Sequence, residues 1–210
     1  MRTSRWFLAL VALAWVAPLA AQAPARQQQP QQPPRPPFMF ETLAFLDGGL
    51  IPYLYTQAAY EKEYQGGASP KIGWVNPPPG TQSFVLHMHD MEVARNKTTE
   101  DQLHWLVWNI PGDATLLPFN VPEGATIASL GGAFQINGRG AAKYLGPGAP
   151  ATGALHHYMF ELIALDTKLA VQPTADGFET RKKVMDAIQG HVLGKALIVG
   201  TFKRPPTTTS

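Results

Sequence analysis

Four ionisable side chains stand at the ends of apolar stretches of the sequence, where they could bind a ligand together. They are Asp90, His104, His156 and Tyr158. Strand ends and loops on a rigid scaffold are where binding sites are commonly built. A protonated imidazole or a phenol O–H donates to a phosphate or a carboxylate, while Asp90 would orient a histidine or accept from an amine. The alternative is that both histidines lie at the core edge and donate to backbone carbonyls.

The faces of the strands that carry these residues determine whether the side chains meet. Alternation predicts three continuous faces. Their members are Phe84, Leu86, Met88 and Asp90; His104, Leu106, Trp108 and Ile110; and His156, Tyr158, Phe160 and Leu162. Each polar residue leads into or ends an apolar face, so we expect all four to converge at one rim of the core. His87, His89 and His157 fall on the opposite faces.

Two other chemistries fit the sequence less well. His87 and His89, taken with His104, resemble a metal-ligand set. The first two point together from one strand while Asp90 points away from them, so no metal site is predicted. A serine hydrolase needs an activated serine, but the sequence has no Gly-x-Ser-x-Gly elbow, and the absence of cysteine excludes thiol catalysis. We therefore predict a protein that is not an enzyme and uses no cofactor.

The elements that must position these residues are mostly strands. The sequence has 20 prolines and 19 glycines, which lie between short aromatic and aliphatic runs, as in many-stranded antiparallel proteins. The predicted strands are Ser83–His89, His104–Ile110, His156–Leu165 and Lys195–Phe202. Glu179–Gln189 is the predicted helix, with Gly190 as its stop. This pattern indicates a β-sandwich or barrel with one or two peripheral helices.

The first 37 residues are not expected to belong to the fold. Arg2 and Arg5 precede an uncharged apolar run that is shorter than the ~20 residues of a membrane-spanning helix, and small residues follow it. Residues 1–23 are therefore predicted to be a signal peptide. Residues 24–37, rich in Gln and Pro, are predicted to be a disordered tether. A single domain at 38–204 and a flexible tail at 205–210 complete the chain.

The charge balance excludes a nucleic-acid partner. The chain has 17 Lys and Arg against 15 Asp and Glu, and two of the arginines leave with the signal peptide. The remaining chain is close to neutral and shows no basic footprint. We expect a periplasmic or secreted protein with no transmembrane segment after signal removal.

Five ordered motifs resemble those of the phosphatidylethanolamine-binding proteins, in their bacterial Raf kinase inhibitor-like branch. They are Ser69–Trp74, Pro79–Phe84, His89–Glu92, His104–Pro111 and Gly146–Tyr158. The first is similar to the family's Ser-Pro-x-x-x-Trp segment, and the second to its Pro-x-Gly-Thr-x-Ser-Phe turn. The last contains a Gly-x-Gly-x-Pro loop and a histidine-led strand. The resemblance extends from about Ile51 to Arg204.

The sequence departs from the family pattern at three places, the first being that Pro79 directly precedes Gly80 where the family has one residue between them. Met91 and Glu92 stand where the family has the last two residues of Asp-Pro-Asp, so only Asp90 matches an acid directly. The missing proline would have fixed φ in that turn. His157 replaces the arginine of the family's His-Arg-Tyr motif, and alternation places it away from the predicted pocket.

The resemblance implies an antiparallel Greek-key β-sandwich with an anion pocket. Its ligand-binding residues would be Asp90, His104, Gly148, Pro150, His156 and Tyr158. The implied function is non-enzymatic binding of a phosphate or phospholipid headgroup. The alternative is a protein-interaction module, such as an inhibitor of a serine protease, which is also found in the family. Without a Cβ, Gly148 is expected to let backbone N–H groups approach a phosphate.

Overall fold

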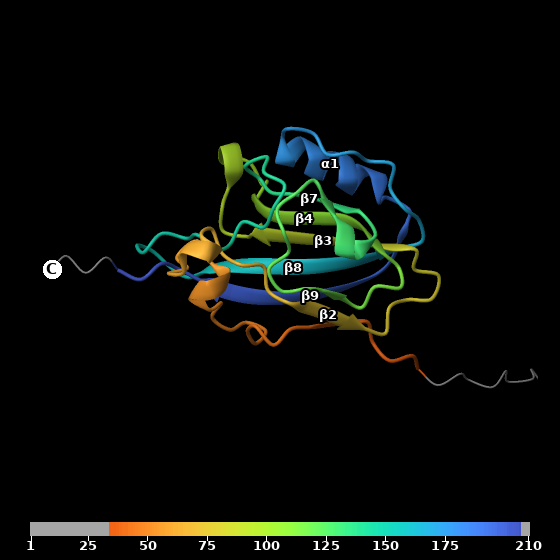
Figure 1. Ribbon diagram of the computed structural model, residues 1–210, viewed down its shortest axis with the longest axis horizontal. Coiled ribbons are helices and arrows are strands. Elements are labelled where there is room, and N and C mark those ends of the chain that lie inside the picture. The colour runs from red at the N-terminus through yellow and green to blue at the C-terminus, as the bar shows by residue number, and fades with distance from the viewer. Residues whose placement is uncertain (1–33, 207–210) are drawn as a thin grey trace, which may run out of the picture. The chain divides into compact units, whose positions relative to one another are not determined.

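The computed structural model describes residues 34–206 (Figure 1). The predicted signal peptide 1–23, most of the predicted tether 24–37 and the last four residues lie outside that range. Within it, no helix is long and apolar enough to cross a membrane. Short 3-10 helices connect the strands, at Tyr53–Tyr55, Lys62–Tyr64, Arg95–Lys97 and Ala128–Leu130.

Six strands form one antiparallel sheet. Their bounds are β3 (Ser83–Asp90), β4 (Gln102–Pro111), β6 (Thr126–Ile127), β7 (Ala133–Ile136), β8 (His156–Leu165) and β9 (Val192–Phe202). The order across the sheet is β6-β7-β4-β3-β8-β9. The four predicted strands are confirmed as β3, β4, β8 and β9, and β8 has the predicted bounds. The starts of β4 and β8 lie beside the end of β3, because each pairs with it in antiparallel fashion.

A second, three-stranded sheet packs against the first. It consists of β1 (Met39–Glu41), β2 (Ile72–Val75) and β5 (Leu116–Leu117), in the order β1-β2-β5. Residues of both sheets form one buried cluster, which includes Ile72, Trp74, Phe84, Leu86, Trp105, Phe160 and Ile198. The predicted antiparallel sandwich is therefore confirmed, although its short strands were not predicted.

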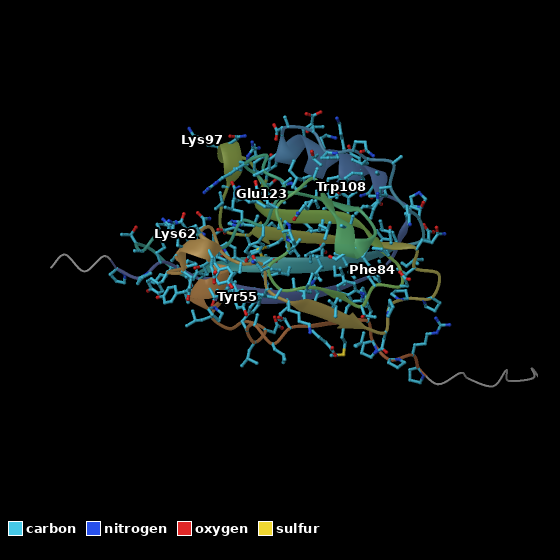
Figure 2. All side chains as sticks on the ribbon, in the orientation of Figure 1. Tyr55, Lys62, Phe84, Lys97, Trp108 and Glu123 are labelled. Carbon is cyan, nitrogen blue, oxygen red and sulfur yellow. The ribbon has the colours of Figure 1, made fainter. Side chains whose placement is uncertain are left out.

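The opposite face of the large sheet is covered by α1 (Gly177–Ala187). The Asp176 side chain accepts from the backbone N–H groups of Phe178 and Glu179 and so fixes the start of the helix. This cap explains why α1 starts earlier than predicted. Val184 of α1 belongs to a second buried cluster with Leu106 and Trp108. Figure 2 labels Phe84 and Trp108, which represent the two clusters.

Two β-bulges in β4 overturn the predicted face of that strand. The Cα partners on either side of the two breaks are Phe84–Ile110 and Leu86–Val107, and Met88–Trp105 and His89–Leu103. At each break β4 contains one residue more than β3 does, which reverses the alternation. Leu106 and Trp108 consequently pack on the α1 side, whereas Ile110 packs between the sheets. The prediction that these residues share a face with His104 is therefore wrong for Leu106 and Trp108, whereas Ile110 lies on the side of Tyr158, which His104 contacts.

One of these bulges contains Asn109. Its φ is 59°, a left-handed conformation that asparagine adopts more readily than most residues. The side-chain amide donates to the Leu169 carbonyl at 2.8 Å, and its oxygen accepts from the Leu169 N–H at 2.8 Å. Asn109 thereby fastens the chain that leads to α1 onto β4.

Candidate functional site

A cavity of about 330 Å³ opens at the rim of the large sheet, where β3 ends and β4 and β8 begin. All six residues that the sequence predicted for a site line this cavity: Asp90, His104, Gly148, Pro150, His156 and Tyr158. The predicted convergence of the histidines, the acid and the phenol is thus observed. Antiparallel pairing is the cause, since it brings these strand ends to one edge.

Asp90 and His156 form the tightest polar contact of the cavity. The His156 Nδ1 atom lies 2.8 Å from one Asp90 carboxylate oxygen and 3.1 Å from the other. Asp90 also accepts from the backbone N–H of Glu92 at 3.1 Å. A carboxylate that accepts at Nδ1 fixes the ring orientation. The Nε2 atom is then the only ring atom of His156 left for a ligand.

His104 is a buried and uncharged member of the cavity wall. Burial lowers the pKa of His104, and this outweighs the opposing effects of the Leu145 carbonyl and Asp90. The Nδ1–H group donates to the Leu145 carbonyl at 2.9 Å, and the ring edge meets Tyr158 with 5.1 Å between ring centroids. His104 therefore holds the loop at Leu145 and does not supply a positive charge to the cavity at neutral pH.

Tyr158 organises the loop that forms one wall of the cavity. Its phenol oxygen accepts from the backbone N–H groups of Gly148 and Ala149, at 3.2 and 3.1 Å. Burial and the nearby Asp90 raise the pKa of the phenol well above its usual value, so the hydroxyl keeps its proton. The uncharged hydroxyl thus holds the loop in place through the two hydrogen bonds that its oxygen accepts.

Gly148 has a structural role that the sequence did not reveal. A Cβ at this position would lie 2.3 Å from the Gln57 Nε2 atom. The Gln57 side chain in turn donates to the Gly146 carbonyl at 2.8 Å. The Gly148 N–H donates to the Tyr158 phenol oxygen, and the approach of backbone N–H groups to a phosphate beside Gly148 stays a prediction.

Arg139 is the charged cavity residue that sequence reasoning missed. It lines the cavity, and its Nη2 atom donates to the Gln57 Oε1 atom at 3.2 Å. Within residues 34–206 it has no carboxylate partner within ion-pair distance. Asn137 positions it, since the Asn137 side chain accepts from the Arg139 backbone N–H at 2.9 Å. The Asn-Gly-Arg-Gly turn at residues 137–140 was the signal available in the sequence.

The residues predicted to face away from the cavity do so. The His157 side chain is about half exposed and contacts Glu92, with 2.5 Å between Nδ1 and Oε1. Partial burial raises the pKa of Glu92, but the hydrogen bonds from His157 outweigh this and lower it. Glu92 therefore connects the turn after β3 to β8 through its hydrogen bonds with His157.

His87 and His89 also face away from the cavity, on the α1 side of β3. His87 is only 8% exposed. His104, which the sequence grouped with them as a metal-ligand set, lies in the cavity instead. Asp101, just before β4, is the neighbour of His87 and His89, and it accepts a hydrogen bond from the His89 Nδ1 atom.

Comparison with known proteins gives one consistent family. The family model described as phosphatidylethanolamine-binding protein matches residues 41–203. A UPF0098 protein of Methanothermobacter thermautotrophicus is 34% identical over 164 residues, which cover 78% of this chain and 97% of that protein. The UPF0098 protein YbcL of Escherichia coli is 33% identical over 114 residues, or 53% of this chain and 61% of YbcL.

Solved structures show the same fold. The crystal structure of CT736 from Chlamydia trachomatis, a putative phosphatidylethanolamine-binding protein homologue, covers 80% of this chain and 97% of its own. It has a TM-score of 0.63 at 26% identity. The crystal structure of Escherichia coli YbcL also has a TM-score of 0.63, at 24% identity, and covers 80% of this chain and 98% of its own.

Proposed function

Because this chain belongs to the phosphatidylethanolamine-binding protein family, whose members are binding proteins rather than classical enzymes, we propose that its cavity binds a small anion. The ligand would be inorganic phosphate or a phosphorylated headgroup. A volume of about 330 Å³ suits such a ligand and is small for a complete lipid.

The position of Arg139 is the observation that supports this proposal. A guanidinium group with no carboxylate partner among the described residues lines a cavity that is partly closed to water. Guanidinium groups bind phosphate and carboxylate oxygens through two parallel hydrogen bonds. The hydrogen bond from Arg139 to the neutral Gln57 side chain orients the guanidinium without cancelling its charge.

The negative charge of Asp90 is compatible with an anion in the cavity, because both oxygens of its carboxylate already have hydrogen-bond partners. Both carboxylate oxygens lie within hydrogen-bond distance of His156, and one also accepts from the Glu92 N–H. When His156 is protonated, the Asp90–His156 pair has no net charge and presents the Nε2–H group as a donor. Arg139 and His156 would then bind the anion from two sides.

Calorimetric titration with inorganic phosphate and with phosphoethanolamine tests the proposal. We expect saturable binding that Arg139→Gln weakens by about ten- to a hundredfold, because one charge-assisted hydrogen bond is worth ~1.5–3 kcal/mol. Lys62→Gln, which removes a positive charge from a residue that does not line the cavity, is the control. Equal affinity in wild type and Arg139→Gln would contradict the proposal. Tighter binding of phosphoethanolamine than of phosphate would identify a headgroup as the ligand.

We also propose that the protein acts outside the cytoplasm, after removal of residues 1–23. The charged and then apolar start of the sequence supports this. N-terminal sequencing of the protein from its native cell should find a start near Gln22 or Pro24. Recovery of an intact Met1 from the membrane fraction would contradict the proposal. The alternative role as a protease inhibitor differs in that it would survive the loss of anion binding in Arg139→Gln.

A further inference from the structure

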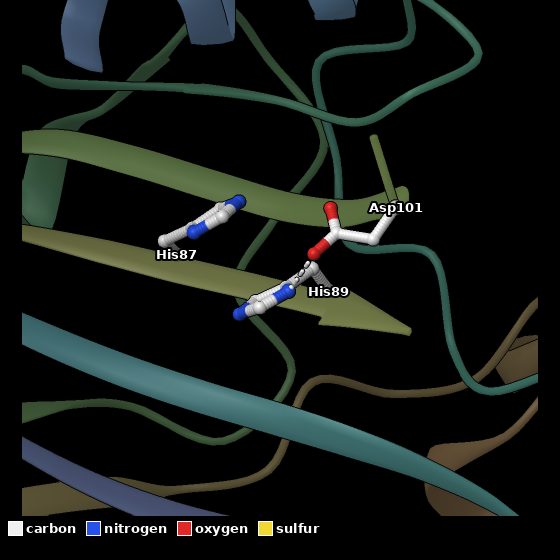
Figure 3. A group of neighbouring side chains, drawn as sticks. All are labelled: His87, His89 and Asp101. Atoms are coloured by element: carbon white, nitrogen blue, oxygen red, sulfur yellow. Dashed lines mark hydrogen bonds and ion pairs between the residues drawn. The ribbon is translucent and has the colours of Figure 1, made fainter. Parts of the chain in front are cut away.

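A second cluster of chemically active side chains lies on the side of the large sheet that α1 covers, away from the cavity. His87 and His89 project from β3, and Asp101 precedes β4 (Figure 3). Each of the three offers one ligand atom, and these atoms all lie within 4.8 Å of one another. The two imidazoles and the carboxylate thus come together from the paired ends of two adjacent strands.

Two ring nitrogens of this cluster are buried without a partner. The Nε2 atoms of His87 and His89 have no hydrogen-bond partner among residues 34–206. His87 is 8% exposed, and the His89 side chain is 12% exposed. Buried polar atoms nearly always have a partner, so two neighbouring exceptions in one cluster need a physical reason. The His89 Nδ1 contact with Asp101 is satisfied within the chain, but the Nε2 atoms are not.

Burial and neighbouring charges change the pKa values of two members of the cluster, His87 and Asp101. Burial lowers the pKa of His87 to about 3, so the ring is uncharged at neutral pH, as a metal-ligating imidazole must be. Partial burial raises the pKa of Asp101, but its contacts with His89 and Arg181 outweigh this and hold it at about 2. At neutral pH the cluster therefore contains an uncharged His87 imidazole beside an ionised Asp101 carboxylate.

We propose that His87, His89 and Asp101 bind one divalent transition-metal ion of the Zn²⁺ class. Two imidazoles with one carboxylate suit Zn²⁺, Ni²⁺, Co²⁺ or Cu²⁺, whereas Mg²⁺ and Ca²⁺ take oxygen ligands. Three protein ligands leave at least one coordination position for water. This site is separate from the anion cavity and independent of the function proposed for it.

Two positively charged side chains, Arg181 and Lys195, lie near the proposed metal site. Arg181 of α1 donates to the Asp101 Oδ1 atom at 2.5 Å and so orients the carboxylate, whose Oδ2 atom accepts from the His89 Nδ1 atom. The guanidinium also repels a cation, so the affinity is lower than that of a site without it. Lys195, the other nearby cation, is paired with Glu161 at 2.8 Å.

Metal binding would change the arrangement of the two rings. They stack in parallel, with 4.3 Å between their centroids and 6° between their planes. A ring nitrogen binds a metal in the plane of its ring, so both rings must turn out of this stack to share one ion. The Asp101 oxygen would then contact the metal in place of the His89 Nδ1 atom, or remain on His89 as a supporting group.

Titration of the chelator-treated full-length protein with ZnCl₂ and with CoCl₂ tests the proposal. We expect one equivalent of metal to bind, with a rise in the thermal midpoint and a visible Co²⁺ absorption band. His87→Gln and Asp101→Asn should each weaken binding by at least tenfold, because even the loss of a supporting residue commonly costs ten- to a hundredfold. His191→Gln is the matched control, since His191 forms a similar but exposed pair with Asp166.

The competing location is the group Asp90, Glu92 and His156 at the cavity, whose ligand atoms also lie close together. It contains one histidine, whereas the proposed site contains two. Electron paramagnetic resonance of the wild type with one equivalent of Cu²⁺ should therefore show two coordinated nitrogens, even if a variant fails to fold. One nitrogen, loss of binding in His156→Gln with retention in His87→Gln, or no saturable binding at all would overturn the proposal.

Discussion

β3 carries polar side chains on both of its faces, and each face contains a histidine–carboxylate pair. On the cavity side, His156 contacts Asp90, and its side chain is 21% exposed. On the α1 side, His89 contacts Asp101, with a neighbouring histidine stacked on it. The residue types are the same, but the second nitrogen of the ring is open to the cavity in one pair and buried without a partner in the other.

This difference shows that the neighbours of a histidine–carboxylate pair decide its chemistry. The cavity side adds Arg139 and an opening to solvent, which suit an anion. The α1 side adds the buried, uncharged imidazole of His87, which suits a metal ion. A single strand can present two such sites because successive side chains point to opposite faces of the sheet.

The largest expected effect concerns the α1 side. Asp101→Ala leaves the Arg181 guanidinium, whose side chain is 12% exposed, and His89 without their carboxylate. We expect the free energy of unfolding to fall by about 3 kcal/mol, at the low end for a broken buried pair because Asp101 is partly exposed. Chemical denaturation in the presence of a chelator measures this.

The control for this prediction is Asp166→Ala, which breaks the exposed pair with His191 and should cost less than ~0.5 kcal/mol. The double variant Asp101→Ala/Arg181→Met should recover most of the loss, since it removes the unpaired charge. Similar losses for Asp101→Ala and Asp166→Ala would mean that the two sides of the sheet do not differ as described.

The next effect concerns the cavity side. His156→Ala should weaken the binding of a phosphomonoester by about ten- to a hundredfold, corresponding to ~1.5–3 kcal/mol for a charge-assisted hydrogen bond. His157→Ala, on the opposite face of β8, should change the affinity by less than about threefold. Calorimetric titration of both variants measures the difference. Equal losses would rule out the assignment of the two β8 faces.

A smaller effect is expected from the buried ring of His104. The fold lowers the pKa of His104, so the unfolded state binds a proton more readily than the folded state does. This difference in pKa stabilises the folded state fully above the unfolded-state pKa of ~6.5. The stabilisation decreases as the pH falls below that pKa. His104→Gln should therefore lose less stability than the wild type between pH 7.5 and 5.5 in denaturant titrations. A steeper loss in the variant would show that the sign is wrong.

The smallest effect is expected from the tether, which touches neither side of β3 in the part that the structure describes. Deletion of residues 24–37 should change the thermal midpoint by less than ~5 °C, or roughly 1 kcal/mol for a domain of this class. Differential scanning calorimetry measures this. A larger fall would mean that the segment packs on the domain, with Pro37 as the first place to examine, because its carbonyl accepts from the Asn76 side chain.

The long strands of the fold could be predicted from the sequence, because alternation and turn residues specify them directly. β8 has the predicted bounds and the predicted faces, with Tyr158 and Phe160 in the core. β4 was predicted as a strand but with the wrong faces, since a bulge leaves no trace in a simple alternating pattern. The two- to four-residue strands of the small sheet are too short to give a periodic signal.

The candidate sites were predictable where residues lie on long strands and not where loops bring them in. Asp90, His104 and His156 were found because they lie at the ends of predicted strands. Arg139 comes from a turn whose position only the fold determines. Asp101 could have been found by pairing the end of β3 with the start of β4, which places it beside His89. The sequence analysis considered each strand separately and so missed it.

The hydrogen bonds that shape the cavity connect segments that are far apart along the chain. His104 and Leu145 are separated by 41 residues, Asp90 and His156 by 66, and Gln57 and Gly146 by 89. Chains dominated by such distant pairings fold slowly, because loop-closure entropy must be lost before the contacts form. No fragment of the protein contains a complete cavity, so ligand binding reports that the entire sandwich has formed. A ligand at a hundred times its dissociation constant would then stabilise the whole domain by ~2.7 kcal/mol.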